Sequence, residues 1–109
     1  MCDFIVYKKP ILCPIECKST CYKSMSIQRD PEDKSSKMIK LHQIQSLVNA
    51  SLADGCYPGL LLNFRNDEDI NDNITYWLPI QGLSDFLVES DKGSINKLDC
   101  IQHGAYIVD

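Results

Sequence analysis

The sequence predicts a mixed α/β domain, with strands at both ends of the chain and one long helix between them. Two strand-like runs come first, at residues 3–7 and 11–20. Apolar residues then recur at helical spacing between residues 38 and 52. Apolar runs at 59–64 and 74–80 indicate a further pair of strands.

The two N-terminal strands can bring polar side chains together. Successive side chains of a strand point to opposite faces, so the run 11–20 has one apolar and one polar face. If this strand pairs with residues 3–7 across Lys8-Lys9-Pro10, Asp3 comes to lie beside Glu16 or Lys18. The predicted apolar face holds Ile11, Cys13, Ile15 and Cys17, and the polar face holds Glu16, Lys18 and Thr20.

The central helix is predicted from capping residues and from an apolar stripe. Ser35-Ser36 offers an N-cap, and Gly55 fits a C-terminal stop. Gln45 falls inside the apolar arc and Gln43 falls opposite, although Gln43 lies early enough in the helix to reach over the sheet. The stripe consists of Met38, Leu41, Ile44, Leu47, Val48 and Leu52.

The second half of the chain predicts alternating short elements. Residues 66–73 are acidic but lack the central Gly and terminal Glu of a calcium loop, which favours a solvated hairpin turn. The expected elements are a strand at 59–64 buried on both faces, its returning partner at 74–80, a short helix at 83–89, a turn or helix at 95–102, and a strand at 106–108.

Asp3, Glu16 and Lys18 are the residue types of a metal-dependent phosphodiesterase. Two nearby carboxylates repel unless a cation lies between them, and Mg²⁺ prefers oxygen ligands. In this interpretation Asp3 and Glu16 bind the ion, Cys17 adds a backbone carbonyl, and Lys18 orients the nucleophile. The alternative is a solvent-exposed ion pair, because Glu-x-Lys alone is a common surface pattern.

Several segments in order resemble one protein family. Among them are Ile15-Glu16-Cys17-Lys18-Ser19 and Tyr76-Trp77-Leu78-Pro79-Ile80. The chain resembles the RecU-like Holliday junction resolvases and phage recombinases of Gram-positive bacteria, also called penicillin-binding-protein-related factor A. The resembling segments are residues 2–8, 15–19, 26–28, 42–44, 59–64, 76–80 and 92–96.

The resemblance implies a fold and a set of roles. The implied fold is restriction-endonuclease-like, a mixed β-sheet flanked by helices. Asp3 resembles the family's metal-binding aspartate, and Glu16 with Lys18 resembles its Glu-x-Lys pair. Gln28 and Gln43 stand where the family places glutamines near the site.

The chain departs from the family at its start. The family opens with a helix carrying a further glutamate and then a first core strand, and both are missing before Asp3. We expect either a natural truncation or a choice made in cloning or gene calling. A sheet that lacks its first strand has an edge of unpaired N–H and C=O groups, which favours association with a second copy.

The length and the net charge of the chain limit the classes of protein to which it can belong. The 109 residues, 44% of them hydrophobic, predict one nuclease-like domain over 1–109. No apolar run or N-terminal pattern predicts a membrane span or a secretory signal, so we expect a cytoplasmic protein of a bacterial or phage-infected cell. The net charge of −4 counts against strong nucleic-acid binding, and most of the basic residues lie in the N-terminal half.

The six cysteines predict neither a zinc site nor a disulfide framework. Cys13, Cys17 and Cys21 recur every four residues, which on a strand separates neighbours by about 13 Å, too far to share one tetrahedral ion. Core packing of Cys13 and Cys17 is the favoured interpretation. A metal or disulfide role is the alternative.

Two functions follow from the sequence. The first is a Mg²⁺- or Mn²⁺-dependent, structure-specific endonuclease that cuts branched DNA during recombination as a homodimer. The second is a catalytically inactive, nuclease-derived phage protein that binds and inhibits a host defence protein, in an anti-CRISPR or anti-restriction role. The acidic composition, the short length and the missing opening segment motivate the second as the alternative, and the endonuclease is the favoured interpretation.

Overall fold

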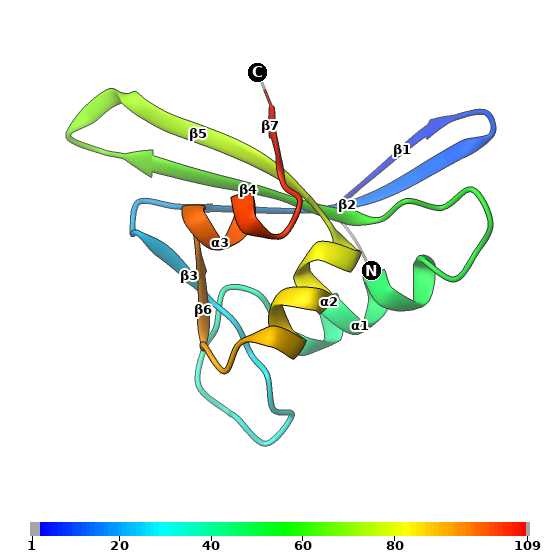
Figure 1. Cartoon of the computed structure of the whole chain (residues 1–109), viewed down its shortest axis with the longest axis horizontal. Coiled ribbons are helices and arrows are strands. Elements are labelled where there is room, and N and C mark those ends of the chain that lie inside the picture. Colours follow the sequence, from blue (N-terminus) through cyan, green and yellow to red (C-terminus); the bar gives the residue numbers. More distant parts are fainter. Residues whose placement is uncertain (1–2, 109) are drawn as a thin grey trace.

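The computed structural model describes residues 3–108 and has a mixed α+β architecture (Figure 1). A five-stranded mixed sheet has the order β1-β2-β4-β5-β7, and a separate two-stranded sheet pairs β3 with β6. The elements are β1 (Phe4–Lys8), β2 (Ile11–Thr20), β3 (Ser24–Ser26), α1 (Leu41–Ala50), β4 (Gly59–Asn66), β5 (Asp69–Pro79), α2 (Ile80–Glu89), β6 (Ser94–Asn96), α3 (Lys97–Gln102) and β7 (Tyr106–Val108).

The main sheet combines both strand directions. β1 and β2 form the predicted antiparallel hairpin, with Phe4 opposite Ile15. β2 runs parallel to β4, with Glu16 beside Leu60, and β4 is antiparallel to β5. The expected terminal strand is confirmed as β7, which lies antiparallel to β5.

The helices gather on one face of the sheet and form the core there (Figure 1). Leu60 and Leu62 of β4 are buried, as is Leu78 of β5. Leu47 of α1 and Phe86 of α2 belong to the same buried cluster. Burial of apolar side chains is the dominant favourable term in folding, so this layer provides most of the stability.

In the described part of the chain, no helix covers the opposite face of the sheet (Figure 1). Ile15, Leu61 and Trp77 alternate with the core residues of their strands and are only half-buried. Cys13 and Cys17 lie on this face as well, half-buried rather than in the core as predicted. The prediction was wrong because alternation defines two faces but does not say which one the helices cover.

The central helix is shorter than its apolar stripe predicted. α1 begins at Leu41, not near Ser35-Ser36, and ends at Ala50. Leu52 therefore lies beyond the helix and is 80% exposed. At the N-terminal end the stripe was misleading because Met38, a loop residue, also packs against the core, whereas Leu52 at the other end is an exposed apolar residue.

Gly55 does not stop the helix but shapes the return to the sheet. Its φ of +76° is a left-handed conformation that L side chains rarely adopt. An added Cβ would lie 2.6 Å from the carbonyl oxygen of Pro10. The Gly55 carbonyl accepts a hydrogen bond from the Leu12 amide at 2.8 Å, which joins this turn to β2.

A second glycine allows close packing between β4 and β5. A Cβ at Gly59 would lie 2.6 Å from Cη2 of Trp77. The indole ring therefore covers the first residue of β4 on the helix-free face.

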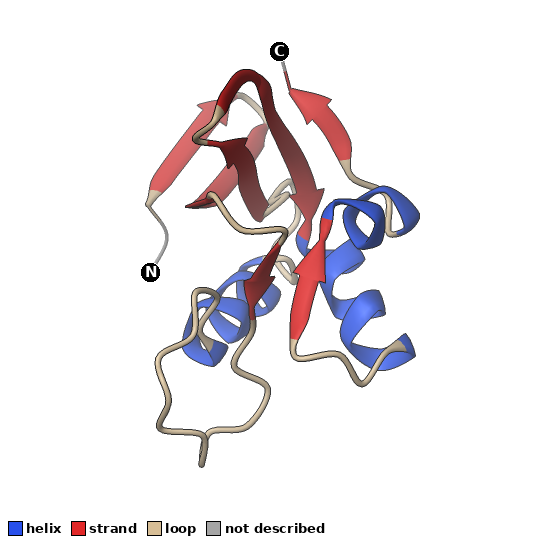
Figure 2. Ribbon diagram, turned by 90° about the vertical axis from the view of Figure 1, so that its left-hand side faces the viewer, coloured by secondary structure: helices blue, strands red, loops and turns tan. Residues whose placement is uncertain are grey.

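The short sheet of β3 and β6 was not predicted. Figure 2 shows these two strands outside the main sheet and beside the helices. Met25 lies opposite Ile95, and both side chains are fully buried. None of the helices within residues 3–108 has the length and apolar character needed to cross a bilayer.

Candidate functional site

Asp3 and Glu16 meet where β1 begins, opposite the middle of β2. Phe4 pairs with Ile15, so the same register places Asp3 across from Glu16. One carboxylate oxygen of Asp3, Oδ2, accepts a hydrogen bond from the backbone N–H of Cys17 at 2.8 Å. That bond fixes Asp3 against β2 and directs its charge toward Glu16.

Glu16 is buried on the helix-covered face of the sheet. Its exposed fraction is 2%. Oε1 accepts a hydrogen bond from Nε2 of Gln43 at 2.8 Å and lies 3.8 Å from Nζ of Lys18. Lys18 and Glu16 therefore share one face of β2, as the alternation of the strand predicted.

The other oxygen of Glu16, Oε2, is buried and accepts no hydrogen bond from the residues that the structure describes. Burial raises the pKa of Glu16, the nearby negative charge of Asp3 raises it further, and Lys18 opposes the shift. A proton shared with Asp3 also favours the neutral form, so the pair needs either that proton or a cation between the two groups.

Gln43 is a positioning residue for Glu16. It is the third residue of α1. Its Oε1 accepts a hydrogen bond from the Lys40 amide at 3.1 Å, and its Nε2 donates one to Oε1 of Glu16. The helical arc had placed Gln43 away from the core and Gln45 within it, whereas Gln45 is exposed. The assignment was wrong because the arc included Met38 and Leu52, which lie outside the helix.

The hydrogen bonds of Gln28 are made to the start of α1 and to the loop before it. Its Oε1 accepts a hydrogen bond at 3.1 Å from the amide of Leu41, the first residue of α1. Its Nε2 donates to the carbonyls of Asp30 and Asp33. Gln28 therefore caps α1 from a distant loop, because Lys40 at the N-cap position provides no side-chain cap.

The surroundings of Cys17 disfavour its thiolate form. Burial raises its pKa, and the charges of Asp3 and Glu16 raise it further. A thiol that stays protonated is a poor nucleophile and a poor metal ligand. Cys13, Cys17, Cys21, Cys56 and Cys100 are all free thiols, whereas Cys2 lies outside the described residues.

The chemistry of these groups fits a divalent cation. Within residues 3–108 no three or more His, Cys, Asp or Glu side chains form a metal cluster, so a dedicated protein cage is absent there. Mg²⁺ is commonly held by only one or two carboxylates, with water and substrate phosphate in the other positions. Asp3 and the unpartnered oxygen of Glu16 match that mode.

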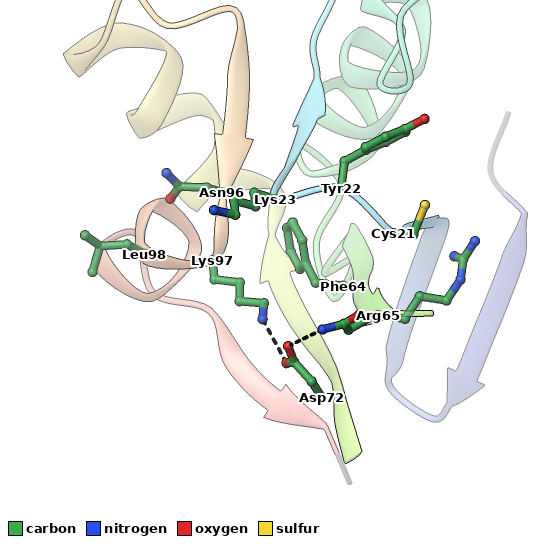
Figure 3. Close-up of a pocket in the computed structure, with 10 residues that line it drawn as sticks. Cys21, Tyr22, Lys23, Phe64, Arg65, Asp72, Asn96, Lys97 and Leu98 are labelled. Atoms are coloured by element: carbon green, nitrogen blue, oxygen red, sulfur yellow. Dashed lines mark hydrogen bonds and ion pairs between the residues drawn. The ribbon is translucent and has the colours of Figure 1, made fainter. Parts of the chain in front are cut away.

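A separate cavity of about 460 Å³ lies beyond the end of β2 (Figure 3). Its lining includes the cations Lys23, Arg65 and Lys97. Lys97 turns toward Asp72 at 3.3 Å, and Arg65 pairs with Asp67 at the same distance. Neighbouring carboxylates thus pair with two of the three cations, and the Asp3–Glu16 pair remains the candidate functional site.

No protein-family model and no curated protein matches this chain. The RecU-like resemblance stays a prediction from the sequence.

Proposed function

We propose that this protein is a Mg²⁺- or Mn²⁺-dependent endonuclease of the Holliday-junction-resolvase type, acting on branched DNA as a homodimer in the cytoplasm. The observations that support it best are the closeness of the Asp3 and Glu16 carboxyl groups and a buried Glu16 oxygen that has no donor among residues 3–108. The restriction-endonuclease-like assignment of the fold belongs to the same proposal. Its support is a mixed sheet with helices on one face and acidic residues on adjacent strands.

Each residue of the site then has a distinct role. A bound Mg²⁺ supplies charge that activates water and polarises a phosphoryl oxygen. Asp3, Glu16 and the carbonyl of Cys17 are the proposed ligands. Lys18, 3.8 Å from Glu16, orients the attacking water and stabilises negative charge on the phosphate. Gln43 keeps Glu16 aimed at the ion through the bond at 2.8 Å.

Cleavage of a synthetic four-way junction tests the activity. We expect cutting with Mg²⁺ or Mn²⁺, abolished in Glu16→Gln and in Lys18→Met. Gln43→Ala should lower the rate by about 10- to 100-fold, because groups that orient metal ligands have effects of that size. The control is Asp91→Asn, which removes an exposed carboxylate outside the site. Inactive wild-type protein, or full activity of Glu16→Gln, would contradict the proposal.

Metal binding can be measured without catalysis. Mn²⁺ at one hundred times its dissociation constant should raise the free energy of unfolding by about 2.7 kcal/mol. The gain should vanish in Asp3→Asn and in Glu16→Gln but remain in Asp91→Asn. An equal gain in all four proteins would point to non-specific ion binding.

A second candidate function is favoured by the exposed surface. Phe4, Ile5, Val6 and Tyr7 are all more than half exposed, and the sequence pI is about 5.0. Exposed apolar side chains on an acidic domain suit protein recognition better than DNA binding. In this alternative the chain is a nuclease-derived phage protein that inhibits a host defence protein of the CRISPR or restriction type.

The double variant Asp3→Asn/Glu16→Gln separates the two candidates. An inhibitor should bind a purified CRISPR or restriction nuclease with unchanged affinity in this variant. An endonuclease should lose junction cleavage in it. Loss of protein binding together with loss of cleavage would contradict the inhibitor function.

A further inference from the structure

The outer edge of β1 is an unpaired strand with apolar side chains. Within residues 3–108, β1 stands at one end of the sheet order and pairs with β2 alone. Phe4, Ile5, Val6 and Tyr7 are 61%, 62%, 53% and 64% exposed. Figures 1 and 2 show the strand at the margin of the molecule, projecting away from the helices. A long apolar edge of this kind promotes strand addition unless a charge, a proline or a bulge blocks it.

The partner for this edge has to be another extended strand. Only a strand can satisfy the alternating N–H and C=O groups along an open sheet edge. Phe4 and Val6 project to the helix-free face, where they lie opposite Ile15 and Cys13. Ile5 and Tyr7 project to the other face. An added strand would therefore need apolar side chains on both of its own faces, and β1 itself has this pattern.

The charges at the two ends of β1 favour a second copy in antiparallel orientation. Asp3 stands immediately before the strand, whereas Lys8 and Lys9 stand at its other end. Antiparallel pairing of two such strands places Asp3 of each copy near the lysine end of the other. Parallel pairing would place like charges together, which is unfavourable.

The opposite edge of the sheet is a weaker match. β7 is also exposed, but it has three residues where β1 has five. A β1–β7 contact between copies would be heterologous and would leave a free edge at each end, which produces open filaments. A β1–β1 contact is isologous and closes as a dimer.

We propose that two copies join β1 to β1 antiparallel and form one continuous sheet across a two-fold axis. Because that axis is perpendicular to the sheet, the helix-covered faces of both copies lie on the same side. Asp3 directly precedes β1, so both Asp3–Glu16 pairs lie near the joint and open toward that side. The inference rests on the homodimer of the proposed function and assigns its interface, but the test of the interface does not depend on catalysis.

Sedimentation equilibrium across a range of concentrations tests the interface. Wild-type protein should be a dimer, and Val6→Lys should raise the dimer dissociation constant at least about thirtyfold, the scale of an interface hot spot. The matched control is Ile107→Lys on β7, which adds the same charge at a site with 63% exposure and should leave the dimer intact. Far-UV circular dichroism confirms folding, since Val6 is outside the core.

Three results would contradict the β1 interface, and a fourth would separate it from the proposed enzyme. A monomeric wild type, a dimer that survives both Val6→Lys and Ile5→Lys, or filaments abolished by Ile107→Lys would each overturn the β1 interface. Protein that dimerises through β1 but neither binds Mn²⁺ nor cuts junctions would support the interface and contradict the proposed enzyme.

Discussion

The carboxyl group of Glu16 occupies a position that disfavours its charge. It is buried, one of its oxygens has no donor, and Asp3 lies beside it. These features raise its pKa in the folded protein. The contribution of Glu16 to stability is then fully present below pH 4.5 and is lost as the pH rises through the folded-state pKa.

Glu16→Gln should therefore stabilise the metal-free protein at pH 7. The amide keeps an oxygen for Gln43 and supplies an N–H donor toward Asp3. We expect a gain on the order of 1 kcal/mol at pH 7 and almost none at pH 4, measured by urea denaturation. Asp91→Asn is the control at both pH values. A variant less stable than wild type at pH 7 would show that the ionised carboxylate has a compensating partner.

The juxtaposition of Asp3, Glu16 and Lys18 was predictable from local sequence. A hairpin turn and strict alternation determine which side chains share a face, and both are short-range features. The contact between Gln43 and Glu16 was harder to predict from the sequence, because it depends on where α1 begins. A shift of a few residues in the start of a helix changes which residues define its apolar arc.

At the scale of elements, α1 is held by a residue from another part of the chain. Gln28 accepts the amide of Leu41 and donates to two carbonyls of the preceding loop. The first amides of a helix have no partner within the helix, and Gln28 satisfies the amide of Leu41.

Gln28→Ala should destabilise the fold by about 1–2 kcal/mol, the usual effect of losing a helix cap. Mn²⁺ binding should be unchanged, because Gln28 does not contact Asp3 or Glu16. Chemical denaturation and a Mn²⁺ titration measure the two effects. Gln45→Ala on the exposed side of α1 is the control and should have little effect. Loss of Mn²⁺ affinity in folded Gln28→Ala would favour the site role that the resemblance implies.

His103 joins the end of α3 to the end of α2. Its Nδ1 contacts the Asp99 carbonyl at 2.7 Å, and its Nε2 contacts Glu89 at 2.9 Å. Both partners accept hydrogen bonds, so the charged ring, which donates from both nitrogens, is favoured. The bond to the Asp99 carbonyl raises the pKa of His103, and Glu89 adds to the effect.

Stability should accordingly fall as the pH rises above 6.5. A folded-state pKa above the unfolded value gives stability that is complete at lower pH and lost through the folded-state pKa. The change should stay below about 1 kcal/mol, because the Glu89 side chain is 67% exposed. Thermal unfolding between pH 6 and pH 8 measures it. The pH dependence should shrink in His103→Gln and persist in His42→Gln; equal profiles for both variants would contradict it.

Elements with strong periodicity were predicted better than those formed by distant pairing. Strands β1, β2, β4 and β7 follow from alternating or continuous apolar runs. Only the second half of β5 does, because its polar residues 69–73 were predicted as part of a solvated turn but belong to the strand. The pair β3–β6 has three residues per strand, and its partners are far apart in the sequence. So short a segment contains too little pattern to show a period.

At the scale of the whole molecule, stability is concentrated around β4. This strand pairs with β2 on one side and β5 on the other, and three of its side chains belong to the core. β7 pairs along three residues at the margin.

Amide hydrogen exchange should reproduce this order. Amides of β4 should exchange slowest, because their exposure requires the unfolding events of highest free energy. Amides of β7 should exchange faster, through local fraying of the strand. At concentrations where the protein dimerises, β1 should gain protection and β7 should not. Mass spectrometry of peptides from each strand measures the rates. Equal protection of β4 and β7 would contradict the proposed distribution.

Trp77 gives the helix-free face its own optical signal. It is the only tryptophan of the chain, and its half-buried ring lies over Gly59 on that face. Edge-to-edge association through β1 leaves this ring in its present surroundings, so the wavelength of its emission should be the same in monomer and dimer. A molecule that settles on the face of the sheet would shield the indole from water and shift its emission to the blue, so that fluorescence alone distinguishes the two modes of contact.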